Sequence, residues 1–209
     1  MIEKLQSKKQ NPNTRLEKRL RGRPKKFDFS LALEQALALF WAQGFEGTSI
    51  SNLSSALNMN RPSIYASFGN KEHLFKRCTE KYLAEKLSFI DEAMNEKNTL
   101  MAFEALFKKE IELISHGKGC LLVNTALTCN PMNEAIKTML TEHRKTLESK
   151  FRKRIQLAQL KKEVGTKESP ATLAKYIASI YQGLSVQTAT GATNRGMREV
   201  VKIALKIFE

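Results

Sequence analysis

Hydrophobic residues recur at helical spacing along nearly the whole chain from residue 28 onward. Apolar residues at i, i+3, i+4, i+7 and i+8 predict one buried face of a first helix: Leu33, Ala36, Leu37, Phe40 and Trp41. The alternation typical of strands is absent, and Gly and Pro fall between the periodic segments. The pattern predicts an all-α fold of about nine helices.

Two short helices follow the first one. Thr48 or Ser49 can cap a helix that turns Leu53 and Leu57 inward, and a turn at 58–60 separates it from a second helix that begins near Arg61. These lengths are typical of a DNA-binding helix-turn-helix at about 49–68, although many helical bundles contain such a corner. The polar face of the second helix favours DNA contact, because small residues and hydrogen-bond donors suit base edges and phosphates better than a core.

Longer helices are predicted over 71–95, 99–116, 120–129, 133–163, 170–190 and 194–208. We expect three parts: a basic arm over residues 1–25, a DNA-binding domain over 26–86, and an effector-binding and dimerisation domain over 87–209.

Positive charge is unevenly distributed. The 209 residues carry 35 Lys and Arg against 21 Asp and Glu, a net charge of +14. Residues 1–27 hold ten basic and two acidic residues, a net of +8, whereas residues 28–82 are neutral. The arm is either a solubilising tail or a segment that orders on DNA, with Arg21 and Arg23 in the minor groove.

Several classes of protein are excluded. The longest apolar run, over 36–42, has seven residues, far below the roughly 20 needed to span a bilayer. The basic N-terminus lacks the apolar segment of a secretory signal, and three Cys fit a reducing cytosol. Nucleotide-binding loops and His-Glu-x-x-His are absent, and the three His and three Cys are scattered. We expect a cytoplasmic protein that is not an enzyme and has no metal, cofactor or membrane partner.

The segments 45–50 and 57–75 resemble the TetR (tetracycline-repressor-like) family of bacterial transcription regulators. The most specific part is Ser63-Ile64-Tyr65-Ala66-Ser67-Phe68-Gly69-Asn70-Lys71-Glu72. The resemblance implies a homodimer that docks two recognition helices in successive major grooves of a near-palindromic operator in double-stranded DNA. It implies phosphate contacts for Thr48, Tyr65 and Lys71, and base reading by Arg61, Ser63 and Ala66, with Ser67 suited to either. Pro62 departs from the small residue common there and removes a backbone N–H that could meet a phosphate.

The second half resembles one branch of that family at two places, 119–124 and 181–187, the latter similar to the eighth helix of that branch. The segment 119–124, Gly-Cys-Leu-Leu-Val-Asn, resembles the start of the sixth helix in repressors that sense electrophiles and aldehydes through a Cys. Cys120 lies at a predicted helix N-terminus beside Lys118, two features that raise the thiolate fraction. The alternative is a small buried hydrophobe.

An effector cavity enclosed by the middle helices has further candidates. Asn124 can orient a ligand, and Phe103, Phe107 and Tyr176 can line the space or belong to an ordinary core, whereas His143 fits the surface better. The last two helices carry apolar stripes suited to a four-helix dimer interface or to an intramolecular core: Ile177, Ile180, Tyr181, Leu184, Val200, Val201, Ala204 and Phe208.

The sequence therefore predicts a DNA-binding transcriptional regulator, a repressor released from its operator by a small-molecule or electrophile effector. The alternative is a ligand-independent DNA-organising or scaffold protein on the same fold.

Overall fold

The computed structural model describes residues 28–115 and 119–209. Those ranges form nine α-helices and a final 3-10 turn and contain no strand, which confirms the predicted fold class. The helices are α1 (Phe29–Gly47), α2 (Ile50–Leu57), α3 (Arg61–Phe68), α4 (Lys71–Met94), α5 (Thr99–Ile114), α6 (Leu121–Thr128), α7 (Glu134–Leu160), α8 (Pro170–Ala189) and α9 (Asn194–Leu205), with Lys206–Phe208 as the turn. None of the helices in these ranges is both long and apolar enough to cross a membrane.

Short polar side chains set the helix starts. Asp28, Asn70 and Asn98 each accept a hydrogen bond from the backbone N–H three residues later, at the starts of α1, α4 and α5. Such N-caps satisfy donors that the first turn of a helix leaves unpaired. Gly44 has a φ of 72° inside α1 and bends the last turn of this helix. These local signals explain why the predicted helices lie close to the observed ones.

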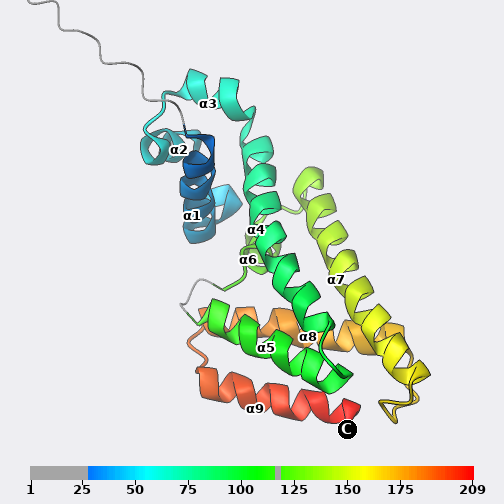
Figure 1. Cartoon of the computed structure of the whole chain (residues 1–209). Helices are drawn as coiled ribbons and strands as arrows, with labels where there is room; N and C mark the ends of the chain where they lie inside the picture. Colours follow the sequence, from blue (N-terminus) through cyan, green and yellow to red (C-terminus); the bar gives the residue numbers. More distant parts are fainter. Residues whose placement is uncertain (1–27, 116–118) are drawn as a thin grey trace, which may run out of the picture.

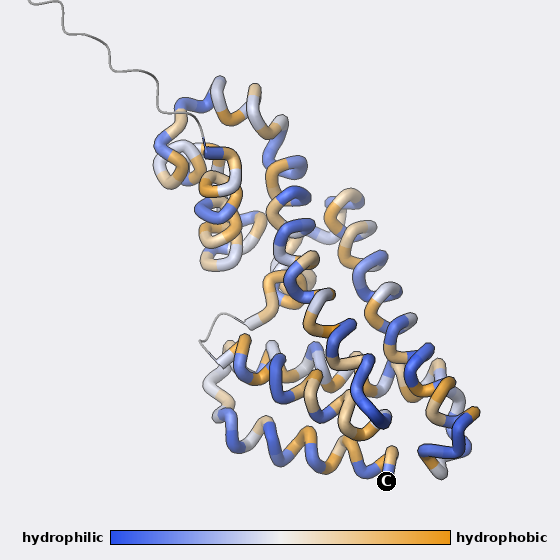
Figure 2. The backbone as a smooth tube through the Cα atoms, in the orientation of Figure 1, coloured by the Kyte–Doolittle hydropathy of each residue, from blue (hydrophilic) through white to orange (hydrophobic). Residues whose placement is uncertain are grey.

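The molecule has two ends joined by α4. Figure 1 shows α1, α2 and α3 together at one end, α5, α8 and α9 at the other, and α4 running between them with α7 nearby. In Figure 2 the apolar positions form stripes along these helices. Two buried clusters result, one around Phe40, Phe45 and Phe75, the other around Phe103 and Phe151.

Helix α6 contributes to the first cluster although it lies far along the chain. Cys120, Leu121 and Leu122 are buried with α1 and the first half of α4. The predicted domain boundary at residue 86 stays a prediction. Helix α6 lies after this boundary in the sequence, yet it packs against the helix-turn-helix end.

Candidate functional site

The helix pair α2 and α3 is fixed by its own side chains. Ser49 caps α2 in a reciprocal arrangement with Asn52, and Asn60 caps α3 by accepting from the Ser63 backbone N–H at 2.8 Å. Asn58 adopts the left-handed conformation in the turn, with a φ of 50°. An Asn tolerates this conformation better than most residues. The short turn therefore holds α3 at a defined angle to α2.

The outer face of α3 is open to solvent. Ile64 and Phe68 are buried, whereas Tyr65 is 52% exposed. The other predicted contact residues of α3 are exposed or half-buried: Arg61, Pro62, Ser63, Ala66 and Ser67. The Arg61 guanidinium donates to the Ser51 hydroxyl at 2.7 Å, which holds its donors at the α2–α3 surface. These residues form one polar face, hereafter the α3 face.

Two residues predicted to contact phosphate have partners within the protein. Thr48 is fully buried, and its hydroxyl donates to the Gly44 carbonyl oxygen at 2.7 Å. The Lys71 ammonium donates to the Phe45 carbonyl oxygen at 3.0 Å and lies 4.2 Å from the centre of the Phe45 ring. Both groups therefore stabilise the bend at the end of α1, and their contacts with phosphate stay a prediction. Arg21 and Arg23 lie outside the described residues.

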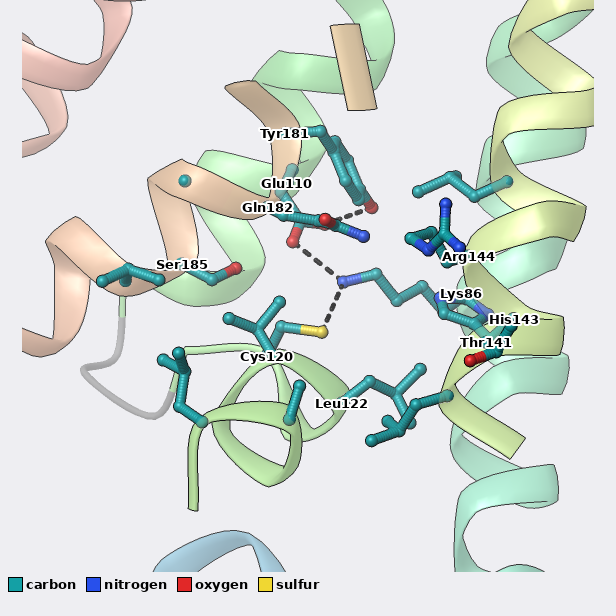
Figure 3. Close-up of a pocket in the computed structure, with 17 residues that line it drawn as sticks. Lys86, Glu110, Cys120, Leu122, Thr141, His143, Arg144, Tyr181, Gln182 and Ser185 are labelled. Atoms are coloured by element: carbon teal, nitrogen blue, oxygen red, sulfur yellow. Dashed lines mark hydrogen bonds and ion pairs between the residues drawn. The ribbon is translucent and has the colours of Figure 1, made fainter. Parts of the chain in front are cut away.

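A cavity of about 360 Å³ lies between α4, α6, α7 and α8. Apolar groups such as Leu122, Leu140 and Val186 form much of its wall, and polar side chains enter it from opposite sides (Figure 3). The polar wall comes from Lys86, Glu110, Thr141, His143, Arg144, Tyr181, Gln182 and Ser185. Mostly apolar walls with a few polar groups are typical of small-molecule sites, and the volume is at the lower end of their range.

An ion pair is buried in this wall. The Lys86 ammonium lies 2.8 Å from Glu110 Oε1, with exposed side-chain fractions of 5% and 0%. Glu110 Oε2 accepts from the Tyr181 hydroxyl at 2.5 Å. Burial by itself lowers the pKa of Lys86, but Tyr181, Cys120 and Glu110 raise it, and the pKa stands well above its ordinary value. Burial and the Glu110 carboxylate raise the pKa of Tyr181, so its hydroxyl stays a donor.

Cys120 faces the same ion pair. Its sulfur accepts from the Tyr82 hydroxyl at 3.3 Å and from the Lys86 ammonium at 3.5 Å (Figure 3 shows the latter). Gly119 has a φ of 60°, and a Cβ there would lie 3.2 Å from the Ser185 carbonyl oxygen. Glycine therefore allows the start of α6 to approach α8. The cation beside the thiol is Lys86, whereas Lys118, which the sequence suggested, lies outside the described residues.

The other predicted effector residues do not line the cavity. Phe103 and Phe107 are fully buried in the core of the second cluster. Tyr176 is 40% exposed on the outside of α8. Neither Tyr176 nor Asn124 is among the residues that line the cavity. His143, which the sequence placed at the surface, is half-buried in the cavity wall instead. Burial lowers its pKa to about 4.

The predicted dimer stripes divide between inside and outside. Six of their residues are buried in the core of the protomer itself, which leaves their side chains no surface to offer a partner: Ile177, Tyr181, Leu184, Val201, Ala204 and Phe208. Ile180 and Val200 stay partly exposed, and Tyr176 and Ile203 lie exposed on the same two helices. Along α8 and α9, most of the exposed apolar residues therefore precede the predicted interface residues by one position, as Tyr176 precedes Ile177 and Ile203 precedes Ala204.

The far end of α6 contacts the end of α1. Glu46 Oε1 accepts from the Asn130 backbone N–H at 3.1 Å and from the Cys129 thiol at 3.7 Å. The eight residues of α6 span about 12 Å. One short helix therefore joins the cavity at Cys120 to the helix-turn-helix end at Glu46.

Comparison with known proteins identifies the family. Residues 32–78 match the family of bacterial regulatory proteins, tetR family. The chain is 26% identical over 201 residues to the HTH-type transcriptional repressor ComR of Escherichia coli, covering 94% of this chain and 96% of ComR. It is 30% identical over 108 residues to the repressor BdcR of the same organism, covering 51% of this chain and 55% of BdcR.

A solved structure agrees over nearly the whole chain. A cysteine mutant of the TetR family regulator CifR, complexed with 26-base-pair double-strand operator DNA, superposes with a TM-score of 0.82 and 29% identity. The match covers 90% of this chain and 100% of that one. Together with the helix-turn-helix and the nine-helix fold, these likenesses show that the chain belongs to the TetR family of bacterial transcription regulators.

Proposed function

We propose that this regulator is a repressor that binds a near-palindromic operator as a homodimer and leaves it when a small effector occupies the cavity. The α3 face is the observation that carries DNA recognition, because it presents polar groups on a helix whose orientation the turn fixes. Arg61 has the strongest chemistry for reading a base, since a guanidinium can donate twice to a guanine. We expect the protein in the cytoplasm, because the bacterial chromosome that such a regulator binds lies there.

The exposed residues of α8 and α9 support the dimer. Tyr176, Ile180 and Val200 line a shallow groove, and Ile203 is exposed on α9 three residues after Val200. Together they form an apolar strip. Two copies of this strip facing each other give a symmetric interface in which each residue meets its own counterpart or its neighbour. The dimer sets the spacing of the two α3 faces, and the operator requires that spacing.

Two elements connect the cavity to the DNA-binding end. Helix α4 carries Lys86 in the cavity wall and Phe75 in the core beside α1, and α6 carries Cys120 at one end and meets Glu46 at the other. An effector lowers DNA affinity only if it binds more tightly to a dimer whose α3 faces are wrongly spaced. A coupling of about 1–3 kcal/mol, usual for allosteric proteins, lowers operator affinity about 5- to 150-fold.

Selection from randomised duplex DNA at physiological salt tests the proposal. The full chain should enrich a near-palindromic sequence, and Arg61→Ala should relax preference at one base pair of each half-site by about 1–3 kcal/mol. Arg152→Ala is the matched control, because Arg152 is exposed on α7 away from the α3 face. Tight binding with a steep salt dependence but no enriched sequence would contradict the repressor and support the DNA-organising alternative.

A further inference from the structure

Several polar side chains of the cavity wall have no hydrogen-bond partner in the described part of the chain. Ser185 on α8 is 0% exposed, and its hydroxyl is unpaired. Thr141, His143 and Gln182 are half-buried in the same wall, and their side chains make no hydrogen bond to a described residue. Buried polar groups in proteins are nearly always hydrogen-bonded, because an unpaired one forfeits its interaction with water. The buried Ser185 hydroxyl in the wall of a cavity therefore points to a ligand as its partner.

These unpaired groups enter the cavity from two different helices. Ser185 and Gln182 belong to α8, whereas Thr141 and His143 belong to α7. Figure 3 shows the Ser185 and Thr141 oxygens directed toward the same space from opposite sides. Leu122 and other apolar side chains form much of the remaining wall. A ligand that meets both sets of polar groups therefore needs an apolar middle and a hydrogen-bonding group at each end.

The charged groups of the wall are paired within the protein, which indicates an uncharged ligand. Lys86 is paired with Glu110, and Arg144 with Glu148 at 2.8 Å. His143 is neutral at pH 7, because burial and the Lys86 charge lower its pKa to about 4. A neutral imidazole still offers one donor and one acceptor. A charged ligand would lose its hydration without gaining an unpaired opposite charge.

We propose that the cavity binds uncharged molecules with an apolar middle and a hydrogen-bonding group at each end, one bonded to Ser185 on α8 and the other to Thr141 on α7. Each of these hydroxyls donates and accepts, so hydroxyls, carbonyls and amides of a ligand suit both positions. Gln182, three residues before Ser185, and His143, two residues after Thr141, offer further donors and acceptors. A ligand of this kind links α7 to α8 across the cavity. This inference rests on the effector cavity of the proposed function and names the chemistry of its ligand.

Binding of three related small molecules to the full chain tests the inference without DNA. 4-Hydroxybenzamide is uncharged and has a hydrogen-bonding group at each end of its ring. 4-Hydroxybenzoate has nearly the same shape but carries a negative charge, and benzamide lacks the hydroxyl. Ligand-observed NMR at pH 7 measures the three Kd values. 4-Hydroxybenzamide should bind about 2- to 12-fold more tightly than benzamide, which is the gain from one hydrogen bond between neutral groups, and about tenfold or more tightly than 4-hydroxybenzoate.

Two substitutions assign the ends of the ligand. Ser185→Ala and Thr141→Val should each weaken the binding of 4-hydroxybenzamide about 2- to 12-fold. Only one of them should weaken the binding of benzamide, because benzamide has a hydrogen-bonding group at one end alone. Thr79→Val is the matched control, because Thr79 is also buried and unpaired but lies outside the cavity, and it should change neither Kd.

The comparison of the three molecules on the unsubstituted chain protects the test against misfolding of a variant. Equal or tighter binding of 4-hydroxybenzoate, no measurable binding of 4-hydroxybenzamide, or an unchanged Kd for 4-hydroxybenzamide in either Ser185→Ala or Thr141→Val would each overturn the inference. Sequence-selective DNA binding by the ligand-free chain would persist in all three cases, whereas failure of the proposed function would remove it.

Discussion

Substitution of Lys86 by Met should destabilise the protein strongly. Met retains most of the aliphatic stem but leaves the Glu110 carboxylate, which is 0% exposed, without its ammonium partner. Of the two donors that contact the carboxylate in the unsubstituted protein, the Tyr181 hydroxyl at 2.5 Å then remains. Breaking a buried ion pair by removing one partner costs about 3–5 kcal/mol, because the other charge stays buried and uncompensated.

The matched control is Lys137→Met. Lys137 pairs with Glu134 at 3.2 Å, with side chains 63% and 73% exposed. Such surface pairs contribute about 0–1 kcal/mol. Lys86→Met with Glu110→Gln should recover part of the loss, since the amide oxygen still accepts from Tyr181 and no charge is left buried.

Thermal and urea denaturation at one fixed protein concentration measure these differences, because the stability of a dimer depends on its concentration. At about 2–4 °C per kcal/mol for a chain of this size, Lys86→Met should lower Tm by roughly 6–20 °C. A loss no larger than that of Lys137→Met would refute the reasoning. It would mean that water reaches Glu110 through the cavity and that the pair is not desolvated.

Three further predictions concern the link to DNA, the dimer face and the cavity histidine. Glu46→Ala removes the acceptor at the α1–α6 contact and should shrink the effector-induced loss of operator affinity about 2- to 30-fold; an unchanged response in fluorescence anisotropy would exclude this contact from the coupling. Ile203→Glu should shift the dimer to monomer in sedimentation, whereas Leu160→Glu, at similar exposure on α7, should not; equal behaviour would rule out the α8–α9 face. Because the pKa of His143 falls from 6.5 to about 4 in the folded protein, the unfolded chain binds more protons between these values, and the free energy of unfolding drops as the pH falls from 6.5 toward 4. His143→Gln should remove about 2 kcal/mol of that drop in urea denaturation at pH 7 and 4.5, and an identical drop in both proteins would show that His143 does not contribute.

The helices and the helix-turn-helix were predictable because their determinants are local. Apolar spacing marks one face of each helix, and Ser49, Asn60 and Asn70 supply the caps where the helices start. The α3 face follows from the same logic, since the positions between Ile64 and Phe68 have to point outward.

The cavity and the dimer face depend on contacts between distant segments. Lys86 occupies an apolar position of α4, four residues after Tyr82 and four before Ile90, and this misplaced charge was the available signal for a buried site. Its partner Glu110 lies 24 residues away, and spacing alone does not pair them. On α8, apolar residues occupy more than one face, so the pattern could not separate Ile177, which is fully buried, from Ile180, which is half-buried at the edge of the core.

The central claim is that the cavity and the DNA-binding end act as one switch. The most direct test compares the affinity of the chain for the selected operator before and after alkylation of Cys120. Titration by fluorescence anisotropy at constant salt should show an affinity about 5- to 150-fold lower after reaction with but-3-en-2-one. Cys120→Ser should keep its affinity under the same treatment. An operator Kd that is the same for the unreacted and the fully alkylated protein would contradict the account.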